Sequence, residues 1–231
     1  MGLIAGPVAD LLAQRGAGLL LDLDGTLVDS ESVHHVAYQQ YFSGRGWHVQ
    51  DQVIWEFSGR RAPDVFATLQ GPWTGEDPRA LTEGVLDALR QSTVRPAPVA
   101  GAARLISASA QGCLPLAVVT SARRWWVLAV LDLLGVGREI PMVTAEDCPA
   151  GKPDPEPFRR GADLLRRPPG DLVAAEDSPA GIASALAAGI GHVVGITTSQ
   201  PAGILIGAGA HSTAPDLVGL ADLVLRREES R

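Results

Sequence analysis

Four short apolar runs recur along this chain, each of a length that suits one buried strand. They are GLLLDL at 18–23, LPLAVV at 114–119, DLVAAE at 171–176 and GHVVGI at 191–196. Helical patterns lie between them, for instance at 123–135 and 178–189. Strands that alternate with helices favour a parallel sheet covered on both faces. The sequence therefore predicts an α/β fold with a three-layer, doubly wound parallel sheet, which binds ligands at the carboxyl ends of its strands.

Residues 33–95 interrupt this alternation. They contain three of the five Trp, both Tyr and three of the four Phe, but no clear buried strand. The region is followed by STVRPAPVAG at 92–101, a Pro-rich stretch that suits a linker. We predict a mostly helical insertion at 33–95, between the first and second strands, with 1–32 and 96–231 forming the core domain.

Charge and composition exclude several classes of partner. The chain has 231 residues, a net charge of −7 and no basic stripe, so we expect no nucleic acid partner. No apolar run approaches the roughly 20 residues of a membrane span, so we expect no membrane partner. The start, MGLIAGPVAD, has no charged segment typical of a signal peptide, which predicts a cytoplasmic protein. We expect a monomer or a weak homodimer.

The first strand ends in two acids separated by one residue, Asp22 and Asp24, within DLDGTLVDSE. Side chains at i and i+2 of a strand point the same way, so both carboxylates occupy one small volume. Their repulsion requires a cation or a shared proton. An acidic surface turn is the alternative, but the three Leu before Asp22 indicate a buried strand that leads outward.

Two other runs also end in polar residues. Thr120 and Ser121 follow the second run, where a hydroxyl and backbone N–H groups can hold an oxyanion, although Thr there is also a common helix cap. Glu176 ends the run at 171–176 and Asp177 follows it; adjacent acids before Ser178 and Pro179 are also a common helix start, and taken alone they favour that interpretation. Beside the acids of the first strand, they complete an oxygen-rich pocket suited to Mg²⁺.

One lysine stands among 19 basic side chains; the other 18 are Arg. It is Lys152, within PAGKPDPEPF at 149–158. A pocket with four carboxylates and a bound phosphate carries excess negative charge. A compact ammonium fits between a carboxylate and a phosphate oxygen, whereas a planar guanidinium does not fill that position equally well. The pattern therefore places Lys152 in the same pocket.

Taken in order, DLDGTLVDSE, VVTSARR, GKPDPEPF and EDSPAGI resemble the motifs of the haloacid dehalogenase superfamily of phosphohydrolases. The resemblance spans nearly the whole chain and implies a Rossmann-like core. The insertion at 33–95 resembles the helical cap of the family. VTAEDCPAGKPDPEPF and TSARR are most similar to sugar- and polyol-phosphate phosphatases, with β-phosphoglucomutases as close relatives.

The resemblance implies a catalytic role for four residues. Asp22 would attack phosphorus to form an aspartyl-phosphate. Asp24 would protonate the leaving alcohol and then deprotonate the attacking water. Thr120, with backbone N–H groups near Ser121, would bind phosphoryl oxygens, and Lys152 would neutralise charge in the transition state.

The resemblance also implies a magnesium site. Mg²⁺ would be held by the carboxylate of Asp22, the backbone carbonyl of Asp24 and the carboxylate of Asp177. Glu176 would bind the ion directly or through water. We therefore expect a Mg²⁺-dependent phosphatase that acts on a small-molecule phosphate ester.

The stretch FSGRRAPDVF resembles the loop of the cap that selects the substrate. Gly59 would begin a turn over the site, and Arg60 or Arg61 could contact distal oxygens of the substrate. A solvated Arg pair is an equal alternative. His34 falls where relatives carry a His near the cap hinge, and Arg124 resembles the Arg of the phosphatase motif TSGTR. Each is also explained as an ordinary residue of a helix surface.

One departure separates phosphatases from mutases. Mutases carry an Arg three residues after the Gly of the cap loop, where it grips a second phosphate. Here that residue is Ala62, which favours a phosphatase. A mutase remains the alternative, since Arg60 or Arg61 could substitute.

Three further classes fit the motifs less well. A dehalogenase of this fold lacks the second Asp and the metal, and a phospho-accepting signalling domain is shorter and has no cap. A non-catalytic binding member would have lost a catalytic group, and none is missing.

Overall fold

The computed structural model describes residues 6–112 and 114–229. Its main sheet has six parallel strands in the order β5-β4-β1-β6-β7-β8. Their bounds are Gly18–Leu21 (β1), Leu116–Val119 (β4), Met142–Val143 (β5), Leu172–Glu176 (β6), His192–Ile196 (β7) and Ser212–Ala214 (β8). The predicted α/β fold is confirmed, and each of the four predicted runs contains one of these strands.

Two strands of the sheet were not predicted, β5 and β8. They have two and three residues, which is too short for a hydrophobic period to show. β8 reads Ser-Thr-Ala, so it also lacks the apolar character of a buried strand. Both lie at the edges of the sheet, where fewer apolar residues are required.

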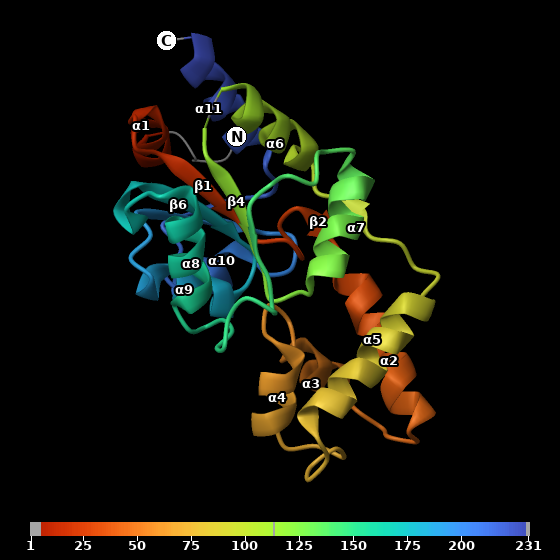
Figure 1. Cartoon of the computed structure of the whole chain (residues 1–231). Helices are drawn as coiled ribbons and strands as arrows, with labels where there is room; N and C mark the ends of the chain where they lie inside the picture. The colour runs from red at the N-terminus through yellow and green to blue at the C-terminus, as the bar shows by residue number, and fades with distance from the viewer. Residues whose placement is uncertain (1–5, 113, 230–231) are drawn as a thin grey trace.

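Helices cover both faces of the sheet, as Figure 1 shows. One face packs against α1 (Pro7–Ala13), α6 (Ala102–Gln111), α7 (Arg124–Leu134) and α11 (Val218–Glu229). The other packs against α8 (Glu156–Leu165), α9 (Pro179–Ala187) and α10 (Ala202–Gly207), and a short 3₁₀ turn spans Pro169–Asp171. Leu19 and Leu21 of β1 belong to the first apolar cluster and Leu20 to the second. This alternation buries the central strand on both faces.

The remaining helices gather beyond one end of the sheet (Figure 1). They are α2 (Glu31–Gly44), α3 (Asp51–Trp55), α4 (Ala62–Thr68) and α5 (Pro78–Gln91). They enclose an apolar cluster of their own, in which the rings of Phe42 and Trp73 stack with centroids 5.2 Å apart. These helices occupy the aromatic-rich stretch noted in the sequence; its division from the core at 33 and 95 stays a prediction.

A two-stranded antiparallel ribbon joins these helices to the sheet. β2 (Val28–Asp29) pairs with β3 (Ala97–Pro98), which lies within the stretch expected to be a linker. The chain therefore enters and leaves the helical region at one place.

The described residues contain no helix that is both long and apolar enough to cross a membrane. Residues 1–5, on which the expectation of no signal peptide partly rests, lie outside the described part. The cytoplasmic location and the monomeric or weakly dimeric state stay predictions.

Candidate active site

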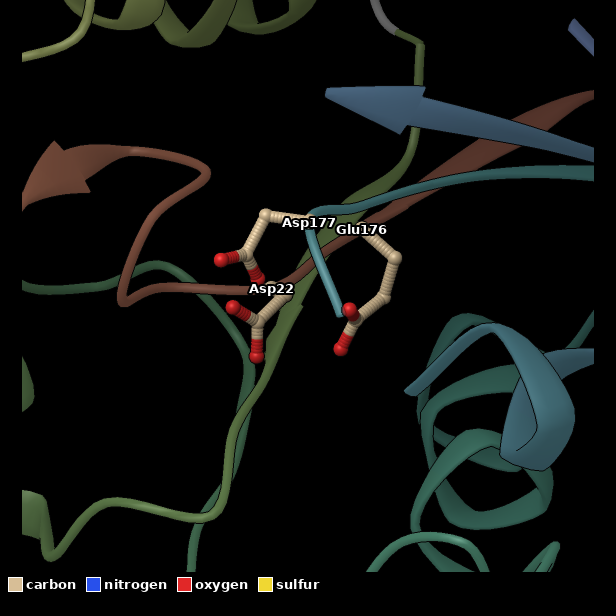
Figure 2. A group of neighbouring side chains, drawn as sticks. All are labelled: Asp22, Glu176 and Asp177. Carbon is tan, nitrogen blue, oxygen red and sulfur yellow. The ribbon is translucent and has the colours of Figure 1, made fainter. Parts of the chain in front are cut away.

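Three buried acids meet at the carboxyl ends of β1 and β6, and we call Asp22, Glu176 and Asp177 the acidic cluster. Each offers a carboxylate oxygen, and these atoms all lie within 4.8 Å of one another. Figure 2 shows the three side chains leaving the ends of the two strands. They converge because β1 pairs in parallel with β6, so that residues following either strand come to the same edge.

Lys152, in the loop before α8, lies against the acidic cluster. Its Nζ donates to Asp22 Oδ1 and, at 2.7 Å, to Glu176 Oε1, and the residue is only 2% exposed. Burial raises the pKa of Asp22 to about 8; Lys152 opposes this shift and Glu176 adds to it. Burial and the neighbouring acids also raise the pKa of Asp177. One ammonium therefore does not neutralise three carboxylates.

The acidic cluster has the chemistry of a divalent cation site. Asp177 Oδ1 is buried and has no hydrogen-bond partner in the part of the chain that the structure describes. Carboxylate oxygens are the ligands that Mg²⁺ prefers, and a cation would satisfy this atom and offset the excess negative charge. The Asp24 carboxylate is not part of the cluster, so Asp24 can contribute only through its backbone carbonyl, the group that the sequence predicts.

Two glycines allow the backbone to approach these carboxylates. A Cβ at Gly25, where φ is +79°, would lie 1.9 Å from Asp177 Oδ2. A Cβ at Gly181 would lie 1.7 Å from Glu176 Oε1. Any side chain at either position would displace an acid of the cluster.

Asp24 has a different environment from Asp22. Its Oδ1 accepts hydrogen bonds from Ser30 Oγ at 2.5 Å and Trp126 Nε1 at 2.8 Å, and it lies 3.0 Å from His34 Nε2. Burial would raise the pKa of Asp24, but His34 and the two other donors lower it below its usual range. Burial tends to lower the pKa of His34. The charge and hydrogen bond of Asp24 outweigh this effect, so the pKa of His34 is raised above its usual value. Two acids whose environments push their pKa values apart are suited to different roles in one reaction.

Trp126 is a site residue that the sequence did not reveal. It stands in the first turn of α7, 102 residues from Asp24, and its ring meets that of His34 edge-on, with centroids 5.5 Å apart. Its neighbours in the sequence suggest an ordinary apolar helix. Only its position directly after the Thr120 turn could have hinted at a role.

The second strand end contributes Thr120 and Ser121. Thr120 is 4% exposed, and its Oγ1 accepts from the backbone N of Ala122 at 3.0 Å, as a capping residue does. Ser121 Oγ donates to the backbone oxygen of Gly59 at 3.2 Å. Ser121 thus links the core to the loop between α3 and α4.

A cavity of about 410 Å³ lies over these strand ends. The sheet side of the cavity is lined by Asp22, Asp24, Thr120 and Ser121. The other side is lined by residues of α2, α3 and α5, the start of α4 and the loop at 57–61. Asp22 belongs to both this cavity and the acidic cluster. The cavity therefore opens directly onto the acids.

The loop at 57–61, which precedes α4, contacts the core; the remaining residues of the predicted cap loop, 62–66, are helical. Gly59 has a φ of +69°, and a Cβ there would lie 2.2 Å from Ser178 Oγ. Arg61 Nη1 donates to the backbone oxygens of Cys148 and Pro149 at 2.9 and 3.0 Å. Arg60 lines the cavity, and its side chain has no hydrogen bond or ion pair with any residue in the described ranges.

Arg124 does not join the other predicted site residues. It is exposed, lies 3.7 Å from an Asp147 oxygen and does not line the cavity. Its neighbour Arg123 lines the cavity instead and pairs with Glu83. His34, in contrast, lines the cavity beside Asp24, as a hinge residue would.

The family model of the haloacid dehalogenase-like hydrolases matches residues 17–189. The chain belongs to this family. It is 36% identical over 186 residues to validoxylamine A 7'-phosphate phosphatase of Streptomyces hygroscopicus subsp. limoneus, covering 79% of this chain and 86% of that one. It is 31% identical to hexitol phosphatase A of Escherichia coli, over 79% and 83% of the two chains.

A solved structure shows the same fold. The crystal structure of a hydrolase from Pseudomonas syringae superposes with a TM-score of 0.82 at 23% identity, covering 89% of this chain and 96% of that one. The resemblance inferred from the four motifs is thus confirmed, and this haloacid dehalogenase-like hydrolase is an enzyme of the phosphoric monoester hydrolase class.

Proposed function

We propose that the chain is a Mg²⁺-dependent phosphatase that hydrolyses a small phosphate monoester, of a sugar or polyol, through an aspartyl-phosphate. One observation carries this proposal: Asp22 belongs to both the acidic cluster and the cavity lining. A phosphate in the cavity would therefore meet a carboxylate beside a cation site. The names of the two relatives, a validoxylamine phosphate phosphatase and a hexitol phosphatase, agree with this class of substrate.

In the first step, a carboxylate oxygen of Asp22 bonds to phosphorus and the bond from phosphorus to the alcohol oxygen breaks. Asp24 gives a proton to that oxygen. His34 Nε2 lies 3.0 Å from Asp24 Oδ1, so this pair holds the proton that the alcohol receives. In the second step, water bonds to phosphorus, Asp24 takes its proton, and the bond from phosphorus to Asp22 breaks.

The other residues hold the phosphoryl group and its charge. Asp22, Glu176, Asp177 and the backbone carbonyl of Asp24 would hold Mg²⁺, which when bound neutralises phosphoryl oxygens. Lys152 lies beside Asp22 and offsets the negative charge of the phosphoryl group as that group is transferred. Thr120 and the backbone near Ser121 stand at the cavity end of β4, where they can donate to phosphoryl oxygens.

A phosphosugar mutase of the β-phosphoglucomutase type is the second candidate. Arg60 favours it, because this cavity cation has no partner among the described residues and could hold a second phosphate. Ala62 argues against it, since a mutase carries Arg there. Isomerisation of β-glucose 1-phosphate to glucose 6-phosphate with a bisphosphate primer, faster than phosphate release, would replace the phosphatase proposal.

The phosphatase is tested with a panel of sugar and polyol phosphates, ranked by kcat/KM with Mg²⁺. Chelation with EDTA should abolish phosphate release and Mg²⁺ should restore it. Asp22→Asn should fold, by circular dichroism, but release no phosphate. Full activity after chelation would remove the metal from the proposal, and turnover by Asp22→Asn would assign the nucleophile elsewhere.

A further inference from the structure

Several apolar side chains that line the cavity are not fully buried, and three of them are Trp55 of α3, Leu86 of α5 and Trp125 of α7. We call these three the apolar wall. Trp55 is 43% exposed, although the His35 ring lies beside it with centroids 5.4 Å apart. Large apolar groups that remain accessible inside a cavity of this size are typical of a site that buries an apolar part of a ligand.

The wall is built by both parts of the molecule. Trp125 comes from the core helix α7, yet it packs against the apolar cluster of α2–α5, as Leu86 does. The rings of Trp125 and Trp126 meet with centroids 5.8 Å apart, and Trp126 donates to Asp24. The wall therefore continues directly from the acid that would protonate the leaving alcohol.

Trp125 also carries an unused donor. Its Nε1 is buried and has no hydrogen-bond partner in the described part of the chain. A buried N–H without an acceptor costs free energy, and such groups are rare unless a ligand or water completes them. Because Nε1 is buried, an acceptor oxygen on the bound molecule would reach this N–H only after the Trp125 side chain shifts, and it would then satisfy the N–H without any charge.

The charges around the cavity disfavour a second anionic group. Arg61 is bound to the backbone oxygens of Cys148 and Pro149, and Arg123 is paired with Glu83. Glu31 and Glu146 line the same cavity. A second anion on the substrate would meet two carboxylates and one uncommitted cation, Arg60.

We propose, resting on the phosphatase function above, that the alcohol part of the substrate is an uncharged, ring-bearing group. Its apolar face covers Trp55, Leu86 and Trp125, and one of its oxygens accepts from Trp125 Nε1. An acyclic polyol would leave these side chains in contact with water, so ring-bearing esters are the better substrates.

The first test uses the unaltered enzyme with Mg²⁺ and two esters of primary alcohols, propyl phosphate and cyclohexylmethyl phosphate. The ring adds several methylenes, each of which is worth about 10-fold or more in a fitted apolar pocket. We expect kcat/KM to favour the cyclohexylmethyl ester by at least about 10-fold. Equal values, or a preference for propyl phosphate, would overturn the inference while leaving a phosphatase. Release of phosphate from no ester at all would instead contradict the proposed function.

The second test examines the acceptor. Tetrahydropyran-2-ylmethyl phosphate differs from the cyclohexylmethyl ester by one ring oxygen, and the enzyme should prefer it. Trp125→Phe keeps a ring but removes the N–H, so this preference should fall to near unity. A preference that survives in Trp125→Phe, or that is missing in the unaltered enzyme, would contradict the assigned hydrogen bond.

The third test changes one residue of the apolar wall and, separately, the charge of the substrate. Leu86→Asn should reduce the ratio of cyclohexylmethyl to propyl ester several-fold, whereas Leu133→Asn, an exchange on the exposed side of α7, should leave the ratio unchanged. A carboxylate added to the cyclohexyl ring should lower kcat/KM. An unchanged ratio in Leu86→Asn, or equal use of the charged ester, would contradict the proposal. If Leu86→Asn fails to fold, the two tests on ester pairs still decide it.

Discussion

The two ends of the cavity hold their side chains in opposite ways. At the core end, Asp22 and Thr120 are nearly inaccessible, and Asp24 accepts from Ser30 and Trp126 and lies within hydrogen-bond distance of His34. At the other end, Trp55 is 43% exposed and Trp125 keeps an unused N–H. One end is fixed by charge and hydrogen bonds, and the other offers apolar surface with few polar partners.

Under the proposed function, the core end of the cavity would carry out the reaction and the wall end would select the substrate. Every phosphate monoester presents the same group to the core end, so that end must be held in one geometry. Esters differ in their alcohol, which the other end contacts. Substitutions at the core end should therefore change kcat for all substrates, and substitutions at the wall should change the ranking of substrates.

The largest effect is expected at Lys152. Lys152→Arg keeps the charge but places a bulkier, planar group in a site that is 2% exposed, between Asp22 and Glu176. Loss of one electrostatic stabiliser typically costs about 10²–10³ in rate, so we expect kcat to fall by that factor for every ester. The measurement is kcat for each ester, with circular dichroism to confirm that the variant is folded.

The matched control is Arg159→Lys, a similar exchange on the exposed surface of α8, which should retain full activity. A rate for Lys152→Arg near that of the unaltered enzyme would mean that any cation serves at this position. The single lysine would then be an accident of composition.

A smaller effect is expected at Trp126, where the two ends meet. Trp126→Phe removes one hydrogen bond to the Asp24 carboxylate, and bonds to charged groups contribute about 1.5–3 kcal/mol. We expect about a 10-fold loss of kcat for propyl phosphate. The loss should be smaller for 4-nitrophenyl phosphate, because its leaving group needs no proton.

Trp125→Phe is the control for this leaving-group effect, since Trp125 makes no hydrogen bond to Asp24 among those the structure describes. It should show no extra loss on the alkyl ester. Equal losses of Trp126→Phe on both esters would indicate that Trp126 only packs α7 and does not position Asp24.

The adjacent arginines of the loop at 57–61 should differ in their effect on substrates in a third experiment. The sequence predicts a substrate contact for either, but Arg61 donates to two core carbonyls and Arg60 does not. Arg61→Ala should lower kcat/KM for all esters alike, by roughly 3- to 10-fold, because it releases the loop. Arg60→Ala should reduce it mainly for esters with distal oxygens. The same pattern for both variants would contradict this division.

The last effect is on stability and not on activity. The pKa of Asp22 is raised to about 8 in the folded protein, from 3.8. The folded state then binds more protons than the unfolded state between these values, so the free energy of unfolding falls as pH rises from about 4 towards 8. The measurement is the free energy of unfolding by denaturant, in EDTA, at several pH values. It should fall with pH for the unaltered protein but not for Asp22→Asn, whose side chain cannot titrate.

Mg²⁺ should reverse the same trend, because a cation stabilises the ionised acids and binds the folded state. A difference between the two proteins that does not change with pH would mean that Asp22 is already ionised beside Lys152 without metal.

Much of the core end follows from the sequence. The runs at 18–23, 114–119 and 171–176 predict strands because each is apolar and short, and a parallel sheet brings their carboxyl ends to one edge. Lys152 was assigned to the same pocket as a compact cation among carboxylates, and the structure brings it there from a loop. Asp22 and Glu176 were assigned to one pocket because they stand at these strand ends, and the structure brings them together. Local pattern suffices here, because strand direction alone determines where these residues lie.

The tertiary structure decided what surrounds these residues. Asp24 takes its partners from α2, its N-cap and α7. Arg61 lines the cavity but spends its guanidinium on two core carbonyls, whereas Arg124 lies outside the cavity. Trp125 joins an apolar cluster that is distant in sequence. None of these contacts leaves a local pattern, because each depends on how the helices at 31–91 sit on the sheet. The sequence by itself was enough to pick out the groups that we propose to react. Packing between distant segments determined their hydrogen bonds and the wall that faces the substrate.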